Sequence, residues 1–150
     1  MRSLVRKLHR YDHTVSGALI YAKEAVLSPM RPRLREHLIT EPQWRVMRVL
    51  NDRGSTDATS VAEVALLHPP SVARILKELE TRGIVAREID PDDKRRAMAI
   101  LTAEGRELIR MVARDVRRVM NEYAERFGAE RMDRLLNELQ AFTAAIKGVE

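Results

Sequence analysis

The sequence has no cysteine at all and few aromatic residues, which make up 4% of its 150 positions. The lack of cysteine excludes disulfides, zinc sites built on thiolates and cysteine redox sensing. No apolar run approaches the roughly 20 residues that a membrane-spanning helix needs, so we expect no membrane partner. The basic N-terminus, MRSLVRKLHRYDH, has no apolar core before a cleavage site, which is not typical of a signal peptide.

What the sequence does have is 45% hydrophobic and 33% charged residues. That composition is typical of a soluble, globular and helix-rich chain. A length of 150 residues is enough for one domain with a buried core. We therefore expect a single domain over residues 1–150 and a cytoplasmic location.

The net charge of +5 is concentrated in one part of the chain. Residues 1–37 carry eight bases and three acids, whereas residues 69–102 carry seven bases and six acids. The total charge is compatible with a nucleic-acid partner. Because the centre is nearly neutral, however, DNA binding must depend on where individual bases point.

Apolar residues at helical spacing predict long amphipathic helices at both ends of the chain. The first has the stripe Leu4, Leu8, Tyr11, Val15, Leu19, Ala22 and Val26, and should end by Pro29 and Pro32. Thr102 is placed to cap another long helix, which Gly128 breaks before a last helix. The flanks 1–37 and 104–150 carry more apolar surface than a small central lobe can cover, so we expect them to form a two-fold dimer interface.

The middle, residues 40–102, predicts a winged helix-turn-helix. Two capping boxes, TEPQ from Thr40 and SVAE from Ser60, should each begin a helix. A third helix should begin at the two prolines after His68 and end at Gly83. The apolar runs IVAREI and AMAIL suit the two strands of a hairpin. The expected fold class is mainly α, with a small β-hairpin wing flanked by dimerisation helices.

The stretch SVARILKELETR places a polar face opposite an apolar one. Arginine can bind guanine with two hydrogen bonds in the major groove, and a residue near the helix N-terminus can reach a base or a phosphate. The candidate DNA contacts on this helix are Pro70, Ser71, Arg74 and Lys77. The alternative is a solvated helix face with pairs such as Arg74–Glu78.

The stretch IDPDDKRRAMAILT has three aspartates and three consecutive bases between two apolar runs. A basic side chain at a wing tip can enter a narrow minor groove, where the potential is most negative. We therefore expect Lys94, Arg95 and Arg96 to contact DNA and Asp93 to hold the fork of Arg95. The alternative is a polar hairpin tip that only contacts water.

The stretch DPDDKRRAMAILTAEG, following PPSVARILKELETRGIV, resembles the MarR family of bacterial transcriptional regulators. The family's wing motif corresponds here to Asp93, Lys94, Arg95, Leu101, Thr102 and Gly105. The resemblance spans nearly the whole chain. It implies a homodimer that binds double-stranded DNA at a pseudo-palindromic operator, and repression that a small phenolic or aromatic carboxylate relieves.

The segment AKEAVLSPMRPRLREHLITEPQWRVMRVL is similar to a branch of that family that regulates homoprotocatechuate catabolism. Trp44 and Arg48 share one helix face and offer a ring and a fork to an aromatic acid. The branch implies a ligand site made of Glu41, Trp44, Arg48 and Met120, with Thr14 or Ser16 from the other subunit. Alternatively, Arg48 pairs with a carboxylate of another helix.

Departures from the branch limit what it implies about the ligand and the operator. Met120 stands where the branch often has tyrosine, and Lys23 where it tends to have arginine. His68-Pro69 replaces a common Leu-Arg, which removes one DNA contact.

Other function classes are poorly supported by the sequence. No nucleophile elbow, phosphate loop or metal triad is present, so we expect neither an enzyme nor a cofactor. His9 and His13 lie one helical turn apart, but no third ligand is evident, so we expect no metal site. A winged-helix interaction module, or one that binds DNA without specificity and without an effector, remains an alternative because residues 69–102 are nearly neutral.

Overall fold

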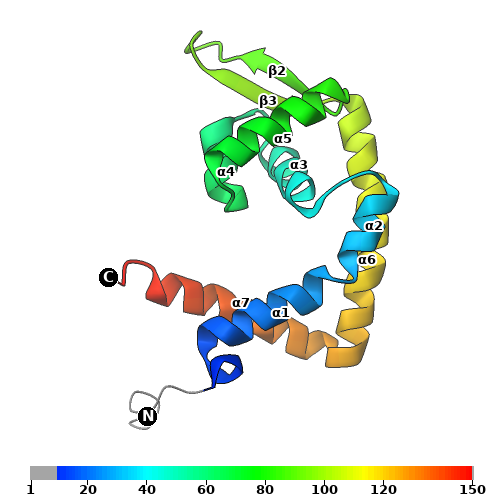
Figure 1. Cartoon of the computed structure of the whole chain (residues 1–150), viewed down its shortest axis with the longest axis vertical. Helices are drawn as coiled ribbons and strands as arrows, with labels where there is room; N and C mark the ends of the chain where they lie inside the picture. Colours follow the sequence, from blue (N-terminus) through cyan, green and yellow to red (C-terminus); the bar gives the residue numbers. More distant parts are fainter. Residues whose placement is uncertain (1–9, 150) are drawn as a thin grey trace. The chain divides into compact units, whose positions relative to one another are not determined.

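The chain is mainly helical, with one small antiparallel sheet (Figure 1). The structure, a computed structural model, describes residues 10–149. The elements, in chain order, are a 3-10 turn (Tyr11–His13), α1 (Val15–Leu27), α2 (Met30–Glu36), α3 (Glu41–Arg53), β1 (Thr56–Asp57), α4 (Ala58–Ala65), α5 (Pro69–Thr81), β2 (Val85–Ile89), β3 (Ala97–Leu101), α6 (Ala103–Phe127) and α7 (Ala129–Ile146). The mainly α fold class with a hairpin wing is thus confirmed.

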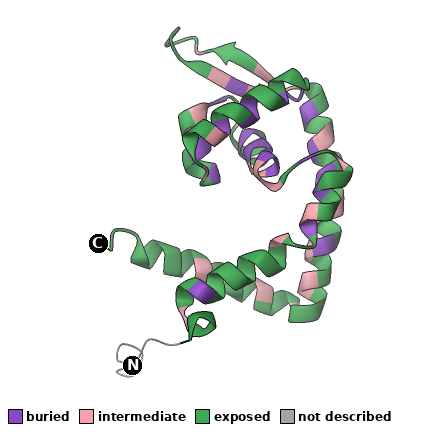
Figure 2. Ribbon diagram, in the orientation of Figure 1, coloured by how far each residue is buried: buried purple, intermediate pink, exposed green. Residues whose placement is uncertain are grey.

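The chain divides into two compact units, one ending at Val112 and the other beginning at Ala113. The first unit contains the sheet, α1 to α5 and the start of α6; the second contains the rest of α6 and α7. Figure 2 shows buried residues concentrated in α3, α4 and α5 of the first unit. In α7, by contrast, no residue is buried. None of the helices in the described residues is both long enough and apolar enough to cross a membrane.

Helix α3 begins as the sequence predicts. The Thr40 hydroxyl accepts a hydrogen bond from the Gln43 backbone N–H, and the Gln43 side chain accepts one from the Thr40 N–H at 3.0 Å. This capping box satisfies two N–H groups that have no partner within the helix. The helix stops at Gly54, whose φ of 74° favours glycine.

The N-terminal region differs from the single long helix that the apolar stripe predicts. Leu4 and Leu8 lie outside the described residues, and α1 begins only at Val15, after Thr14 caps it. The sequence does not predict α2, yet Pro32 lies within its first turn. Proline is tolerated there because first-turn N–H groups have no partner within the helix.

The sequence predicts that Ser60 caps α4, and this prediction is wrong. Asp57 is the cap and its carboxylate accepts a hydrogen bond from the Ser60 backbone N–H at 3.0 Å, so Ser60 lies inside the helix. The capping-box pattern at Ser60 gave a cap three residues too late, because aspartate is as good a cap as serine.

The predicted hairpin is present, with a third strand that the sequence pattern missed. β2 and β3 pair antiparallel with Val85 opposite Leu101, and the two-residue β1 pairs with the other edge of β3, placing Asp57 opposite Met98. After the hairpin, the Thr102 hydroxyl accepts from the Gly105 N–H at 3.0 Å at the start of α6. Gly128, with φ of 97°, separates α6 from α7, as predicted.

Candidate nucleic-acid interface

Helix α5 presents one face to the core and the other to solvent. Two prolines occupy its first positions, and its buried residues are Val72, Ile75, Leu76 and Leu79. On the opposite face, the Arg74 side chain is 74% exposed, and Lys77 and Pro70 are also exposed. Ser71, at the start of the helix, is half-buried. The four residues predicted from the sequence therefore lie on or beside the free surface of α5.

Arg74 is held only loosely within the protein. Its Nε lies 4.0 Å from Oε1 of Glu78, which is at the limit of an ion pair. Glu78 is itself oriented by α3, because the Gln43 side chain donates a hydrogen bond to its Oε2 at 3.1 Å. The Arg74–Glu78 pair of the solvated-face alternative thus exists, but such an exposed pair is weak and leaves the guanidinium available to DNA.

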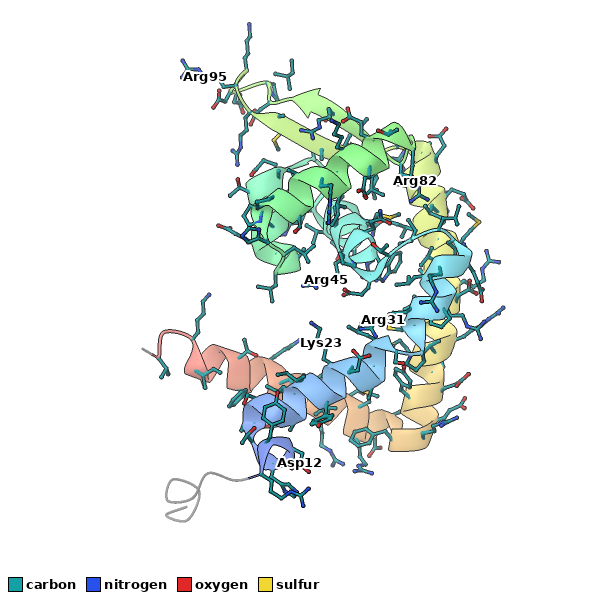
Figure 3. The ribbon with its side chains drawn as sticks, viewed as in Figure 1. Asp12, Lys23, Arg31, Arg45, Arg82 and Arg95 are labelled. Carbon is teal, nitrogen blue, oxygen red and sulfur yellow. The ribbon has the colours of Figure 1, made fainter. Side chains whose placement is uncertain are left out.

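The wing tip is turned by its aspartates. The Asp90 carboxylate accepts from the Asp92 N–H at 2.9 Å, and the Asp93 carboxylate accepts from the Arg95 N–H at 3.0 Å. Asp90 and Arg96 then close the hairpin through a 3.0 Å backbone hydrogen bond. Lys94 and Arg95 are exposed, and Figure 3 shows Arg95 at the tip of the hairpin.

The predicted side-chain pair of Asp93 with Arg95 is wrong. The Asp93 carboxylate accepts a hydrogen bond from the backbone N–H of Arg95. Of the three consecutive bases at the wing tip, Arg96 is the one with a carboxylate partner among the described residues, and that partner is Asp57. Asp93 lies only two residues before Arg95, so its carboxylate stabilises the backbone turn at the wing tip. Asp57, on β1, is brought to the wing by the sheet.

Asp57 is the most strongly perturbed carboxyl of this region. The backbone N–H of Ser60 holds its pKa down to about 2, with help from the Ser60 hydroxyl at 2.8 Å and from the Arg96 guanidinium, although burial opposes the shift. Its side chain is only 13% exposed. A charge in such a position is stabilised by hydrogen bonds from several directions.

The predicted ligand residues of α3 are only partly brought together. The Arg48 guanidinium carbon lies 5.8 Å from the centre of the Trp44 ring, and Trp44 is buried while Arg48 is half-exposed. An Arg48 nitrogen also lies 3.8 Å from Asp52, so its carboxylate partner is on the same helix rather than another. Glu41 lies 3.6 Å from Arg45.

The remaining predicted ligand residues have other surroundings within one chain. Thr14 caps α1 and lies 3.3 Å, hydroxyl to hydroxyl, from Ser16, which is exposed. Met120 is half-buried and belongs to the second unit. Because the sequence predicts that Thr14 or Ser16 comes from a second subunit, a single chain leaves their role a prediction.

A hollow of about 370 Å³ lies at the start of α3, and sequence reasoning placed only Glu41 in it. Its lining residues are Arg31, Arg35, Ile39, Thr40, Glu41 and Pro42. Arg31 is fixed by two hydrogen bonds to Glu24 of α1, at 2.5 and 2.9 Å. The signal that could have identified the two arginines is their i,i+4 spacing, but it has meaning only once α2 is known to be a helix.

Arg45 is a further residue that sequence reasoning missed. Its guanidinium donates to the carbonyl of Ala65, and to that of Leu66 at 3.1 Å, so it binds the C-terminal end of α4 from α3. Carbonyls at a helix end have no partner within the helix, and cations there are stabilising. Arg45 therefore fixes α4 just before the turn into α5.

No cluster of histidine and acidic side chains able to hold a metal ion occurs in residues 10–149. His13 lies 3.7 Å from Asp12, and His9, its possible partner in a metal pair, lies outside the described residues.

Comparison with known proteins gives a consistent assignment. The model of the MarR family matches residues 39–97, which include α3 to β2 and the wing tip. The HTH-type transcriptional regulator FarR of Neisseria gonorrhoeae is 35% identical over 89% of this chain and 91% of its own length. The homoprotocatechuate degradative operon repressor of Escherichia coli is 34% identical over 85% of this chain and 86% of its own.

A similar solved structure is that of NadR in complex with 4-hydroxyphenylacetate. It is 33% identical, has a TM-score of 0.79, and the alignment covers 96% of this chain and 99% of that one. Both the sequence and the fold therefore agree with regulators rather than enzymes. The chain belongs to the MarR family and is a DNA-binding transcriptional regulator with a winged helix-turn-helix.

Proposed function

We propose that this protein is a homodimeric repressor of an aromatic-compound catabolic operon. It binds a pseudo-palindromic operator in double-stranded DNA and is released by a small phenolic or aromatic carboxylate. The observation that supports the DNA-binding part is the free cationic surface of α5, with Arg74 and Lys77, together with Arg95 at the wing tip. The similarity to the homoprotocatechuate operon repressor supports the class of operon.

The proposed dimer rests on apolar faces that each unit leaves exposed. Among the residues of α1 only Gly17 is buried, and the exposed apolar residues include Val15, Leu19, Ile20 and Val26. In α7 the exposed apolar residues include Leu135, Leu136, Phe142 and Ile146. In this proposal the apolar faces of the helices in residues 1–37 and 104–150 form the dimer interface of a single MarR-like domain, and residues 40–102 bind DNA.

The proposed effector site is centred on Trp44 and Arg48. Their contact joins an aromatic ring to a half-exposed guanidinium, which suits a ligand with a ring and a carboxylate. The structure of NadR with 4-hydroxyphenylacetate supports this ligand class. Glu41 and Met120, with Thr14 or Ser16 of a second subunit, would complete the site.

One binding experiment tests the DNA-binding part of the proposal. The wild-type protein selects duplexes from a random library, and fluorescence anisotropy then measures its affinity for the selected duplex and for a shuffled one. Arg74→Ala should weaken binding to the selected duplex by about 1–3 kcal/mol and relax the preference at one base position. Arg95→Ala should also weaken it, whereas Arg33→Ala, on α2, should bind as wild type does.

Addition of 4-hydroxyphenylacetate to the same complexes tests the effector site. The wild-type and Arg33→Ala complexes should dissociate, whereas Arg48→Ala should bind DNA but no longer release it. Continued release by Arg48→Ala would contradict the site. Equal affinity of the wild type for selected and shuffled duplexes would instead favour the alternative, a winged-helix module without specific DNA recognition.

A further inference from the structure

Asp57 lies where three structural features of the first unit meet. It ends β1, caps α4 through the Ser60 N–H, and its carboxylate pairs with the Arg96 side chain. The two residues are 39 positions apart. The pair therefore joins the lobe formed by helices α3, α4 and α5 to the wing.

The pairing of β1 with β3 brings Arg96 of the wing close to Asp57. Asp57 is opposite Met98 of β3, and Arg96 is two residues before Met98, immediately ahead of the strand. Residues two apart along an extended strand have side chains on the same face. The Arg96 side chain thus starts near the Asp57 carboxylate, while its backbone N–H and C=O close the hairpin with Asp93 and Asp90.

The two partners differ in exposure in a way that indicates their roles. The Asp57 side chain is 13% exposed, and its two oxygens already accept from Ser60, so its position is fixed. Arg96 is 51% exposed and reaches from the hairpin to this fixed carboxylate. Lys94 and Arg95 form no ion pair within residues 10–149, and they remain available at the tip.

We propose that Asp57 is a positioning residue for DNA binding. Its contact with Arg96 holds the wing against the N-terminus of α4, in the orientation in which Lys94 and Arg95 reach DNA, and Arg96 is not itself a DNA contact. The inference rests on the proposed wing–DNA contact. It revises that proposal by giving one of the three wing cations to the protein rather than to the operator.

The Asp57–Arg96 pair should strengthen DNA binding because a wing that is not held in place must be ordered on binding, which costs free energy. At its base the hairpin packs on the helices through the buried Val85, Ala99 and Leu101. Nearer the tip it is held by the two-residue β1 pairing, by a 3.3 Å hydrogen bond from the Ser55 hydroxyl to Glu88, and by an exposed ion pair between Arg87 and Glu80, also 3.3 Å between nitrogen and oxygen. Exposed ion pairs contribute little. Without the Asp57–Arg96 pair the wing samples more orientations, and binding must then restrict them.

The two roles of Arg96 predict opposite effects of Asp57→Asn. Asparagine caps helices as well as aspartate does, so the Ser60 contact at α4 is retained. If Arg96 bound DNA, removal of its carboxylate partner would free it and leave the affinity unchanged or higher. If Asp57 positions the wing, the same substitution weakens binding.

The experiment measures anisotropy with the selected duplex for Asp57→Asn, Arg96→Ala and the double variant. We expect each single variant to bind about tenfold more weakly, as loss of a charged hydrogen bond does. The double variant should be no weaker than the weaker single one. The control pair Glu36→Gln and Arg33→Ala, whose side chains are 3.2 Å apart on α2, should leave the affinity unchanged.

A second readout separates wing positioning from a general loss of structure. Wing contacts with the minor groove favour narrow A·T tracts. Exchange of the A·T pairs beneath the wing for G·C should weaken the wild type, and this discrimination should shrink in Asp57→Asn and Arg96→Ala. A general folding defect would lower active protein equally for both duplexes and leave the discrimination intact.

The outcomes distinguish this inference from the proposed function. Unchanged or tighter binding by Asp57→Asn, or additive losses in the double variant, overturns the inference. So does unchanged binding by Arg96→Ala. If Asp57→Asn does not fold, Arg96→Ala provides the test. Weaker binding by Arg96→Ala with intact A·T discrimination also overturns the inference. If Arg95→Ala has wild-type affinity, the proposed wing contact itself fails.

Discussion

At the scale of single residues, Asp57 connects folding with pH. Its folded pKa of about 2 lies below the ordinary value of 3.8, chiefly because the Ser60 backbone N–H bonds the ionised form. A group with a lowered folded pKa contributes stability above the unfolded value, and that stability is lost as the pH falls through the folded one.

This gives a prediction for the acid limb of unfolding. The wild type should exceed Asp57→Asn in free energy of unfolding by on the order of 1 kcal/mol at pH 7, allowing for solvent screening of the Arg96 pair. The difference should vanish between about pH 4 and pH 2. Urea unfolding at a series of pH values measures it. A difference that persists unchanged at pH 2 would show that the charge of Asp57 is not its source.

At this scale the sequence predicts which side chains are exposed, but it does not predict which residues form ion pairs. The helical period places Arg74 and Lys77 on the outer face of α5, and both are exposed. It cannot choose between Asp93 and Asp57 as the partner of a wing arginine. The contact with Asp57 spans 39 positions and exists only because β1 pairs with β3.

At the scale of elements, Gly105 joins the wing to α6. A Cβ at this position would lie 2.2 Å from the Ile84 carbonyl oxygen, which also accepts from the Thr102 N–H at 3.0 Å. The glycine of the Leu-Thr-x-x-Gly motif is therefore required by close packing of the first turn of α6 against the residue preceding β2.

The steric contact and helix propensity predict opposite effects of Gly105→Ala. Propensity alone would stabilise the helix by about 1 kcal/mol. The clash with backbone should outweigh this and lower the free energy of unfolding by about 2 kcal/mol. Urea denaturation measures the sign, with Glu104→Ala on the exposed side of the same turn as a control expected within about 0.5 kcal/mol of wild type. A more stable Gly105→Ala would contradict the packing account.

The elements that sequence patterns predicted are those with strong local signals. The Thr40 capping box, the two prolines before Ser71 and the apolar stripe of α5 fix their helices locally. By contrast, β1 has two residues and depends on β3, and α2 contains Pro32, which the sequence pattern alone indicates as a helix end. At the start of α4 two residues that cap helices well, Asp57 and Ser60, lie three positions apart. Asp57 is the cap because its carboxylate accepts the hydrogen bond from the Ser60 backbone N–H.

At the scale of the whole molecule, we propose that a symmetric dimer binds DNA through α5 and the wing. The apolar faces of α1 and α7 that are exposed within their own units need a partner surface, which a second copy would supply. A two-fold dimer that places one α5 in each major groove requires two half-sites about one helical turn, or a multiple of it, apart.

Hydroxyl-radical footprinting of the selected duplex tests this mode of binding. We predict two protected regions related by symmetry, with centres about 10 base pairs or a multiple apart. Arg95→Ala should lose the minor-groove protection under each wing while Arg33→Ala retains it. A single asymmetric footprint would show that the protein does not bind as a symmetric dimer, and a footprint that Arg95→Ala leaves unchanged would show that the wing does not contact the minor groove.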